Sequence, residues 1–257
     1  MATIFCIANQ KGGVGKTTTT VNLAAGLARL NQKILLVDLD PQGNATMGSG
    51  IQKTTLDASI YEVLLGLSDV ESIRQRASTD HYDILPANRE LAGAEIEMVD
   101  IERRERRLKE ALDTVRDRYD FVLIDCPPAL SLLTLNAFCS ADGVIIPMQC
   151  EYYALEGLSD LVNTVKHVHA NLNRNLRIIG LLRVMFDKRA TLSQHVSDQL
   201  EKHFGDRVFK TVIPRNIRLA EAPSYGLPGI DFDPSSRGAQ AYLNFAEEML
   251  GWLQTRR

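Results

Sequence analysis

The sequence lacks the features that mark several common classes of protein. Only four cysteines occur in 257 residues, and none stands in a Cys-x-x-Cys pair. Three of them lie in or beside apolar runs, so we expect buried thiols that pack as small hydrophobic side chains, without a disulfide or a metal. No apolar stretch is long enough to cross a bilayer, and the first residues lack the positive charge of a signal peptide. These absences predict a cytoplasmic protein.

Excess positive charge is also missing. Lys and Arg number 29 against 32 Asp and Glu, a formal net charge of −3. A dedicated nucleic-acid-binding domain usually carries a basic excess, so only a local basic patch is compatible with that function. The chain has no internal repeat, low-complexity segment or stretch that resembles a linker. Residues 1–257 are therefore expected to form one domain.

What the sequence does contain is an alternation of short β-rich runs with helical stretches. This pattern is typical of an α/β fold with a mostly parallel twisted sheet and helices on both faces. The predicted strands are residues 4–8, 34–38, 82–86, 121–125, 143–147, 178–186 and 208–212, and the predicted helices are 16–30, 101–118, 155–170, 192–204 and 237–253. Ligands of such sheets bind beyond the carboxyl ends of the strands.

A glycine-rich loop follows the first predicted strand. Its residues are Gln10, Lys11, Gly12, Gly13, Val14, Gly15, Lys16 and Thr17, with Thr18 next. Glycines let successive backbone N–H groups curl around a phosphate, and the helix that starts here adds its positive dipole end. Lys16 is placed to neutralise the β and γ phosphates, and the Thr17 hydroxyl to ligate Mg²⁺. The loop therefore predicts a P-loop ATPase.

Two aspartates follow other predicted strands. Asp125 ends an apolar strand, as expected of a carboxylate that holds Mg²⁺ through its water shell. Asp40 lies just beyond the strand that ends at Asp38, where it is placed to orient or deprotonate an attacking water. Asp is also common in turns, so a loop cap is the alternative interpretation of either residue.

The glycine-rich loop departs from the general P-loop pattern at one end. Gln10 stands where glycine is usual, and Lys11 adds a second lysine. With Lys11, the loop resembles the deviant Walker A motif of the ParA/MinD class of ATPases. Residues 38–44 resemble the switch I segment of that class, and Asp125-Cys126-Pro127-Pro128 resembles its Walker B and switch II. Residues 214–224 are similar to the carboxyl-terminal signature of chromosomal ParA proteins, often called Soj.

The resemblance implies roles for particular residues. Lys11 would reach across a homodimer to the partner's ATP, which makes it catalytic together with Asp40. The P-loop residues 11–18 would bind ATP, Thr17 and Asp125 would bind Mg²⁺, and Pro214 and Asn216 would lie against the adenine. Hydrolysis would then require dimerisation.

The resemblance also implies partners. The ATP-bound dimer would bind DNA without sequence specificity through Arg189 and Arg218, with Lys188 and Arg215 close in sequence. Without the resemblance, these arginines would be ordinary solvated side chains. A ParB-type protein would stimulate hydrolysis, and the protein would associate with the nucleoid during chromosome or plasmid partition. Because the sequence begins at its first strand, we expect no helix-turn-helix extension and no site-specific operator binding.

Three other functions share parts of these motifs. A MinD-like ATPase acts at a membrane surface through an amphipathic terminal helix, but Glu247, Glu248 and Gly251 make a poor lipid-binding face, so no membrane partner is expected. An electron-transfer ATPase similar to the nitrogenase iron protein would need a cluster held by cysteines, and Cys126 and Cys139 do not fit the expected positions. A switch that binds ATP without hydrolysis conflicts with the presence of Asp40 and Lys11.

Overall fold

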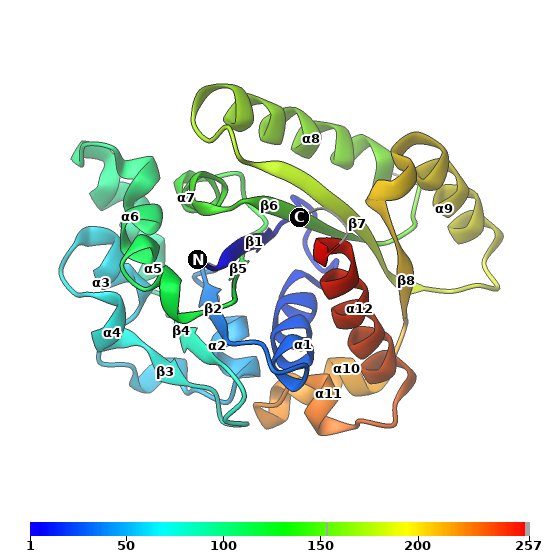
Figure 1. Cartoon of the computed structure of the whole chain (residues 1–257), viewed down its shortest axis with the longest axis horizontal. Helices are drawn as coiled ribbons and strands as arrows, with labels where there is room; N and C mark the ends of the chain where they lie inside the picture. Colours follow the sequence, from blue (N-terminus) through cyan, green and yellow to red (C-terminus); the bar gives the residue numbers. More distant parts are fainter. Residues whose placement is uncertain (153, 255–257) are drawn as a thin grey trace.

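A single eight-stranded sheet runs through the computed structural model, which describes residues 1–152 and 154–254 (Figure 1). Its strands lie in the order β3-β4-β2-β5-β1-β6-β7-β8, and β3 alone is antiparallel to its neighbour. Their bounds are β1 Thr3–Ile7, β2 Ile34–Asp38, β3 Gln75–Arg76, β4 Asp83–Leu85, β5 Phe121–Asp125, β6 Gly143–Met148, β7 Arg177–Phe186 and β8 Val208–Pro214. The predicted mostly parallel α/β sheet is confirmed.

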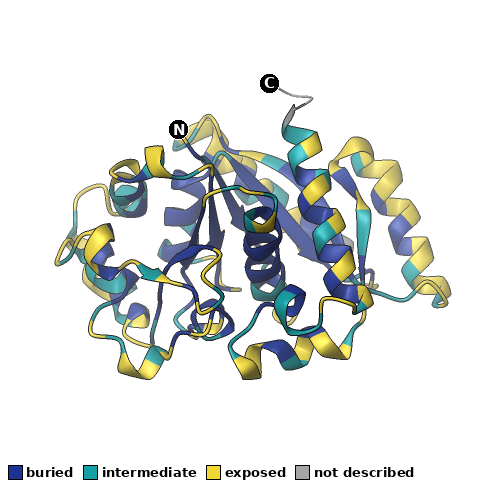
Figure 2. Ribbon diagram, turned by 60° about the horizontal axis from the view of Figure 1, so that its bottom comes forward, coloured by how far each residue is buried: buried dark blue, intermediate teal, exposed yellow. Residues whose placement is uncertain are grey.

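The central strands are buried on both faces, as expected of a parallel sheet covered by helices. Side chains of one face form a core with α1, α11 and α12, and those of the other form a core with α3 to α9. The buried sides of these helices face the sheet in Figure 2. The longer helices are α1 Lys16–Arg29, α7 Leu132–Ser140, α8 Ala154–Asn171, α9 Thr191–Phe204 and α12 Arg237–Gln254, and the shorter are α2 Asn44–Gly48, α3 Ile60–Leu65, α4 Val70–Ile73, α5 Leu91–Glu97, α6 Arg107–Asp113, α10 Ile217–Glu221 and α11 Gly229–Phe232.

The continuous helix predicted over residues 101–118 is wrong. The segment contains only α6, flanked by the 3-10 turns η3 (Arg104–Arg106) and η4 (Arg116–Arg118). Arg103 has a φ of 56°, a left-handed conformation that interrupts a right-handed helix. The Asn136 amide accepts the Leu108 N–H at 3.1 Å and donates to the Arg104 carbonyl at 2.9 Å. These bonds satisfy backbone groups that a continuous helix would pair internally.

The carboxyl-terminal helix α12 packs on the protein itself. Tyr242, Phe245, Ala246 and Met249 are buried, and the Tyr242 hydroxyl lies 3.0 Å from the Thr19 hydroxyl on α1. The apolar face of this helix therefore covers the sheet. The last residues of the segment weighed for membrane binding, 255–257, lie outside the described residues. Within the described ranges, no helix combines the length and the apolar character that a membrane span requires. All four cysteines are buried and free.

Candidate active site

The glycine-rich loop connects the end of β1 to the start of α1, as predicted. Gly13 and Gly15 have φ values of 73° and 72°, a left-handed conformation that glycine adopts without strain. Gly15 caps α1 without a side-chain hydrogen bond, so no side chain competes for the amide groups of the first helical turn. A Cβ added at Gly12 or Gly13 would meet no atom within 4 Å. The loop is therefore open to solvent at these two glycines.

The two lysines of the loop occupy different environments. Lys16 is buried, with 7% of its surface exposed, and its ammonium donates to the Lys11 carbonyl at 3.1 Å. Burial lowers the pKa of Lys16, against the opposing effect of the Asp125 charge. The Lys11 side chain is 51% exposed and forms an ion pair with Glu151, in the loop after β6. Lys16 thus faces the interior of the loop, whereas Lys11 lies on its outer surface.

Asp125 lies beneath the start of α1. Its carboxylate accepts hydrogen bonds from the Thr17 hydroxyl at 2.7 Å and the Thr20 hydroxyl at 3.0 Å. The structure therefore brings the two residues predicted to bind the metal into direct contact. Complete burial, together with the neighbouring Asp38 charge, raises the pKa of Asp125 to about 8. Thr20 was not predicted, although it lies one helical turn from Thr17 on the same helix.

Asp38 fixes the segment that carries Asp40. Its carboxylate accepts the Asp40 N–H at 3.2 Å and both the N–H and the hydroxyl of Thr46, at 2.8 and 2.7 Å. Burial raises the pKa of Asp38 to about 6. Asp38 is also the register partner of Asp125 across β2 and β5, so two buried carboxylates lie side by side. Sequence reasoning assigned no role to Asp38.

The turn after Asp40 requires a glycine. The Asp40 carbonyl accepts the Gly43 N–H at 2.8 Å, and its carboxylate accepts the Gln42 N–H at 2.9 Å. Gly43 has a φ of 60°, and a Cβ there would lie 2.7 Å from the Ala87 carbonyl oxygen. A larger residue would therefore displace the turn. Asp40 itself is 9% exposed and lies at the same sheet edge as the P-loop.

ATP and Mg²⁺ fit these residues on the chemistry of the donors. The loop is open at Gly12 and Gly13, and the charge of the buried Lys16 would be offset by phosphates. Burial, and to a lesser extent repulsion from neighbouring carboxylates, raises the pKa values of Asp38 and Asp125, and a divalent cation beside them would stabilise their ionised forms. No group of three or more His, Cys, Asp or Glu that could hold a metal occurs in the described part of the chain. Thr17 and Asp125, which are in direct contact, would hold Mg²⁺ together with the phosphates and water.

A cavity of about 250 Å³ adjoins the P-loop helix. Thr17, Thr18 and Asn22 of α1 form one wall, and Asn44 and Leu219 lie on others. Pro214 and Asn216, the residues expected to contact the adenine, end β8 and cap α10 at this edge but do not line the cavity. Asn22, Asn44 and Leu219 had not been predicted as site residues.

The two arginines expected to contact DNA follow neighbouring strands, since Phe186 of β7 pairs with Pro214 of β8. Arg189 is 91% exposed in its side chain and binds Asp187 at 3.1 Å. Arg218 is 56% exposed and binds Glu221 at 2.9 Å and Asp233 at 3.4 Å. Both arginines are therefore on the surface, and carboxylates of the same chain offset their charges.

Similarity to known proteins agrees with this geometry. Residues 2–178 match a family described as an AAA domain. The chain is 53% identical over 249 residues to the sporulation initiation inhibitor protein Soj of Bacillus subtilis, covering 97% of this chain and 98% of the relative. It is 50% identical over 251 residues to the chromosome-partitioning ATPase Soj of Thermus thermophilus, covering 97% and 96%.

A solved structure is similar over its whole length. The cobyrinic acid a,c-diamide synthase of Mycobacterium smegmatis, with bound ATP analogue and magnesium, superposes with a TM-score of 0.88 at 36% identity, covering 100% of this chain and 98% of that one. Fold, loop and carboxylates together define a P-loop ATPase of the deviant Walker A type. Within that class, the chain belongs to the Soj/ParA family of chromosome-partitioning ATPases.

Proposed function

We propose that this protein is the ATPase of a DNA partition system, in which an ATP-bound homodimer binds DNA and hydrolysis releases it. The observation that carries the proposal is the pair of lysines in the P-loop. Lys16 faces the interior of the loop, whereas Lys11 is half-exposed, where a second subunit can approach it. A cation supplied by a partner would neutralise the phosphates much as an arginine finger does.

The chain's own residues divide the chemistry among them. Amide groups of residues 12–18 would hold the phosphates, Lys16 would offset their charge, and Thr17 and Asp125 would hold Mg²⁺. Bound Mg²⁺ would supply Lewis-acid stabilisation of the developing phosphate charge. Asp40, which Asp38 and Gly43 hold in place, orients the attacking water. Pro214 and Asn216 remain the residues proposed to contact the adenine.

Binding to DNA would depend on dimerisation. A single chain has a net charge of −3, and the charges of Arg189 and Arg218 are offset by carboxylates. Two copies would double the number of phosphate contacts, and affinity rises steeply with that number. Arg189→Glu is expected to abolish binding to nonspecific duplex DNA and to leave ATP binding intact. Unchanged, salt-sensitive binding of DNA by this variant would contradict the assignment.

The partition role requires a ParB-type partner and a cytoplasmic location on the nucleoid. The deciding experiment is ATPase activity measured alone, with DNA, with the cognate ParB-type protein, and with both. Synergistic stimulation is expected, because a switch needs slow intrinsic hydrolysis and a trigger for release. A rate that responds to neither addition would exclude the partition function.

Two alternatives are less well supported. A MinD-like role would need a terminal helix free to bind lipid, yet residues 242–249 of α12 contribute buried side chains to the core. ATP-dependent sedimentation with liposomes would support that role. A cluster shared between subunits would need exposed cysteines, yet Cys126 and Cys139 are 1% and 3% exposed.

A further inference from the structure

A second cavity lies at the amino ends of the strands, on the opposite side of the sheet from the carboxyl ends where the P-loop lies. Its volume is about 510 Å³, within the range of roughly 300–1,000 Å³ that is usual for small-molecule sites. It is formed where β2, β4 and β5 begin, whereas the P-loop follows the end of β1. We call it the basal cavity and define it by its charged and aromatic lining residues Lys33, Arg74, Arg76, Asp83, Arg118 and Tyr119.

The lining of the basal cavity is strongly cationic. Four of its side chains are Lys or Arg, and Asp83 is its single carboxylate among the described lining residues. His81 also lines the cavity, with its imidazole 3.6 Å from Asp231. A hollow lined by one sign of charge concentrates ions of the opposite sign. The whole chain has a net charge of −3, so the excess of positive charge is local to the lining of the cavity.

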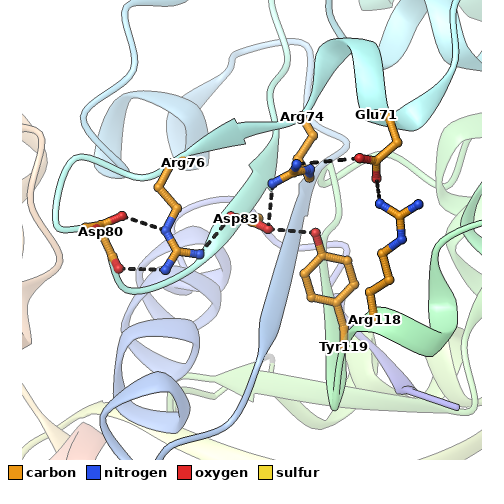
Figure 3. A network of polar contacts seen from close by, with 7 residues as sticks. All are labelled: Glu71, Arg74, Arg76, Asp80, Asp83, Arg118 and Tyr119. Atoms are coloured by element: carbon orange, nitrogen blue, oxygen red, sulfur yellow. Dashed lines mark hydrogen bonds and ion pairs between the residues drawn. The ribbon is translucent and has the colours of Figure 1, made fainter.

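Carboxylates hold the three arginines in fixed positions (Figure 3). Asp83 accepts hydrogen bonds from Arg74 at 3.0 Å, Arg76 at 2.8 Å and the Tyr119 hydroxyl at 2.7 Å. Beyond the lining, Arg76 also binds Asp80 at 2.8 Å, and Arg118 binds Glu71 at 2.6 Å. A guanidinium group has five N–H donors, so each arginine keeps donors that these contacts do not use. The ion pairs therefore orient donors without exhausting them.

Lys33 adds a positive charge that the network does not offset. Its backbone N–H donates to the Asp120 carboxylate at 2.8 Å, and its carbonyl accepts the N–H groups of Asp120 and Phe121. Its ammonium has no ion pair or hydrogen bond with any residue that the structure describes. The backbone of Lys33 is thus fixed in the cavity wall, and its ammonium charge is available to a ligand.

The acidic residues around the cavity limit the kind of anion that fits. Asp80 and Glu71, which pair with Arg76 and Arg118 of the lining, are 85% and 39% exposed in their side chains. A nucleic acid backbone lying across this surface would meet these carboxylates and be repelled. A small molecule would place its anionic group inside, against Lys33 and the arginines, and its organic part against the half-buried Tyr119 ring.

We propose that the basal cavity is a binding site for a small phosphate-bearing molecule, with Lys33 and Arg118 as the residues that contact the phosphate. Guanidinium groups match phosphate oxygens in geometry, and a lysine ammonium adds a point charge. The site is separate from the P-loop, so it does not depend on the proposed partition function.

The test uses inorganic pyrophosphate as the probe and the full-length chain with Lys16→Ala, which removes phosphate binding at the P-loop. Isothermal titration should show one site with a dissociation constant below about 1 mM that weakens with salt. Adding Lys33→Glu should weaken binding at least about tenfold, whereas Lys33→Arg should retain it. Lys109→Glu, on α6 and outside the cavity lining, is the charge-reversal control and should bind pyrophosphate as the parent does. Urea unfolding of each variant identifies any loss of folding.

Arg118→Gln gives an independent test if Lys33→Glu disturbs folding, and it should also weaken binding. Absence of pyrophosphate binding in the Lys16→Ala chain, or equal affinity in the Lys33→Glu and Lys109→Glu variants, would overturn the proposal. A titration with duplex DNA, on the chain without Lys16→Ala, tests whether the cavity binds DNA in place of a small molecule. Loss of DNA binding in Lys33→Glu with unchanged pyrophosphate affinity would also overturn it.

Discussion

Replacing Glu151 by Gln is expected to strengthen the proposed ATP-dependent dimerisation. In the monomer, the Lys11 ammonium pairs with the Glu151 carboxylate, and the two side chains are 51% and 48% exposed. An exposed ion pair contributes about 0.2–1 kcal/mol. If each subunit delivers Lys11 to its partner's ATP, dimerisation breaks two such pairs. The total of about 0.4–2 kcal/mol corresponds to a dimer dissociation constant that falls roughly 2- to 30-fold in Glu151→Gln.

The assay is sedimentation velocity with Mg-ATP over a range of protein concentrations, in an Asp40→Ala background that is expected to block hydrolysis. Glu102→Gln, a second exposed carboxylate, is the control and should leave the dissociation constant unchanged. High salt should reduce the difference, because it screens exposed pairs. An unchanged or weaker dimer in Glu151→Gln would refute the idea that the ion pair restrains Lys11 in the monomer.

Three further predictions concern the buried carboxylates Asp125 and Asp83 and the turn after Asp40 that contains Gly43. Asp125→Asn should stabilise the ligand-free protein, and more at pH 8 than at pH 5. The pKa of Asp125 is raised in the folded state, so its ionisation opposes folding as pH rises. Urea unfolding at both pH values tests this, and an equal increase in the midpoint at pH 5 and pH 8 would contradict it. Asp83→Asn should destabilise by about 1–2 kcal/mol at pH 7, because it removes the carboxylate that Arg76, Tyr119 and Arg74 bind. Burial of Asp83 opposes ionisation, but these partners outweigh it and hold its pKa below the ordinary value, so its contribution is complete above pH about 4 and is lost as pH falls through the lower folded pKa. Asp117→Asn is the exposed control, and equal urea midpoints for the two Asn variants would disprove the effect. Gly43→Ala should lower ATP turnover with little change in ATP affinity, because the alanine Cβ would collide with the Ala87 carbonyl and displace Asp40. An unchanged turnover number would show that the turn is not constrained.

The local sequence was sufficient to predict the buried strands and the P-loop. The buried strands read as continuous apolar runs, and the glycine spacing around Lys16 fixed the loop between β1 and α1. Asp125 could be predicted because it ends such a run. Thr20 was accessible to the same reasoning, since it lies one turn after Thr17 on one helix.

Contacts between distant segments were not accessible. β3 has two residues, too few for a periodic pattern. The helix predicted over residues 101–118 is interrupted because Asn136, from another helix, pairs with backbone groups of this segment. The Lys11–Glu151 ion pair joins residues 140 positions apart, and the basal cavity assembles four separate segments. Asp38 looked like an ordinary strand residue until the register placed it beside Asp125.

The proposal of a dimeric active site is tested most directly by sedimentation velocity of the Asp40→Ala chain with and without the additional change Lys11→Ala. With Mg-ATP, the Asp40→Ala chain should form a dimer, and with ADP it should remain a monomer. The Lys11→Ala, Asp40→Ala chain should bind ATP but remain a monomer at the same concentrations, because no cation reaches the partner's phosphates. An equally stable ATP-dependent dimer without Lys11, or a dimer that forms regardless of nucleotide, would contradict the proposed role of Lys11.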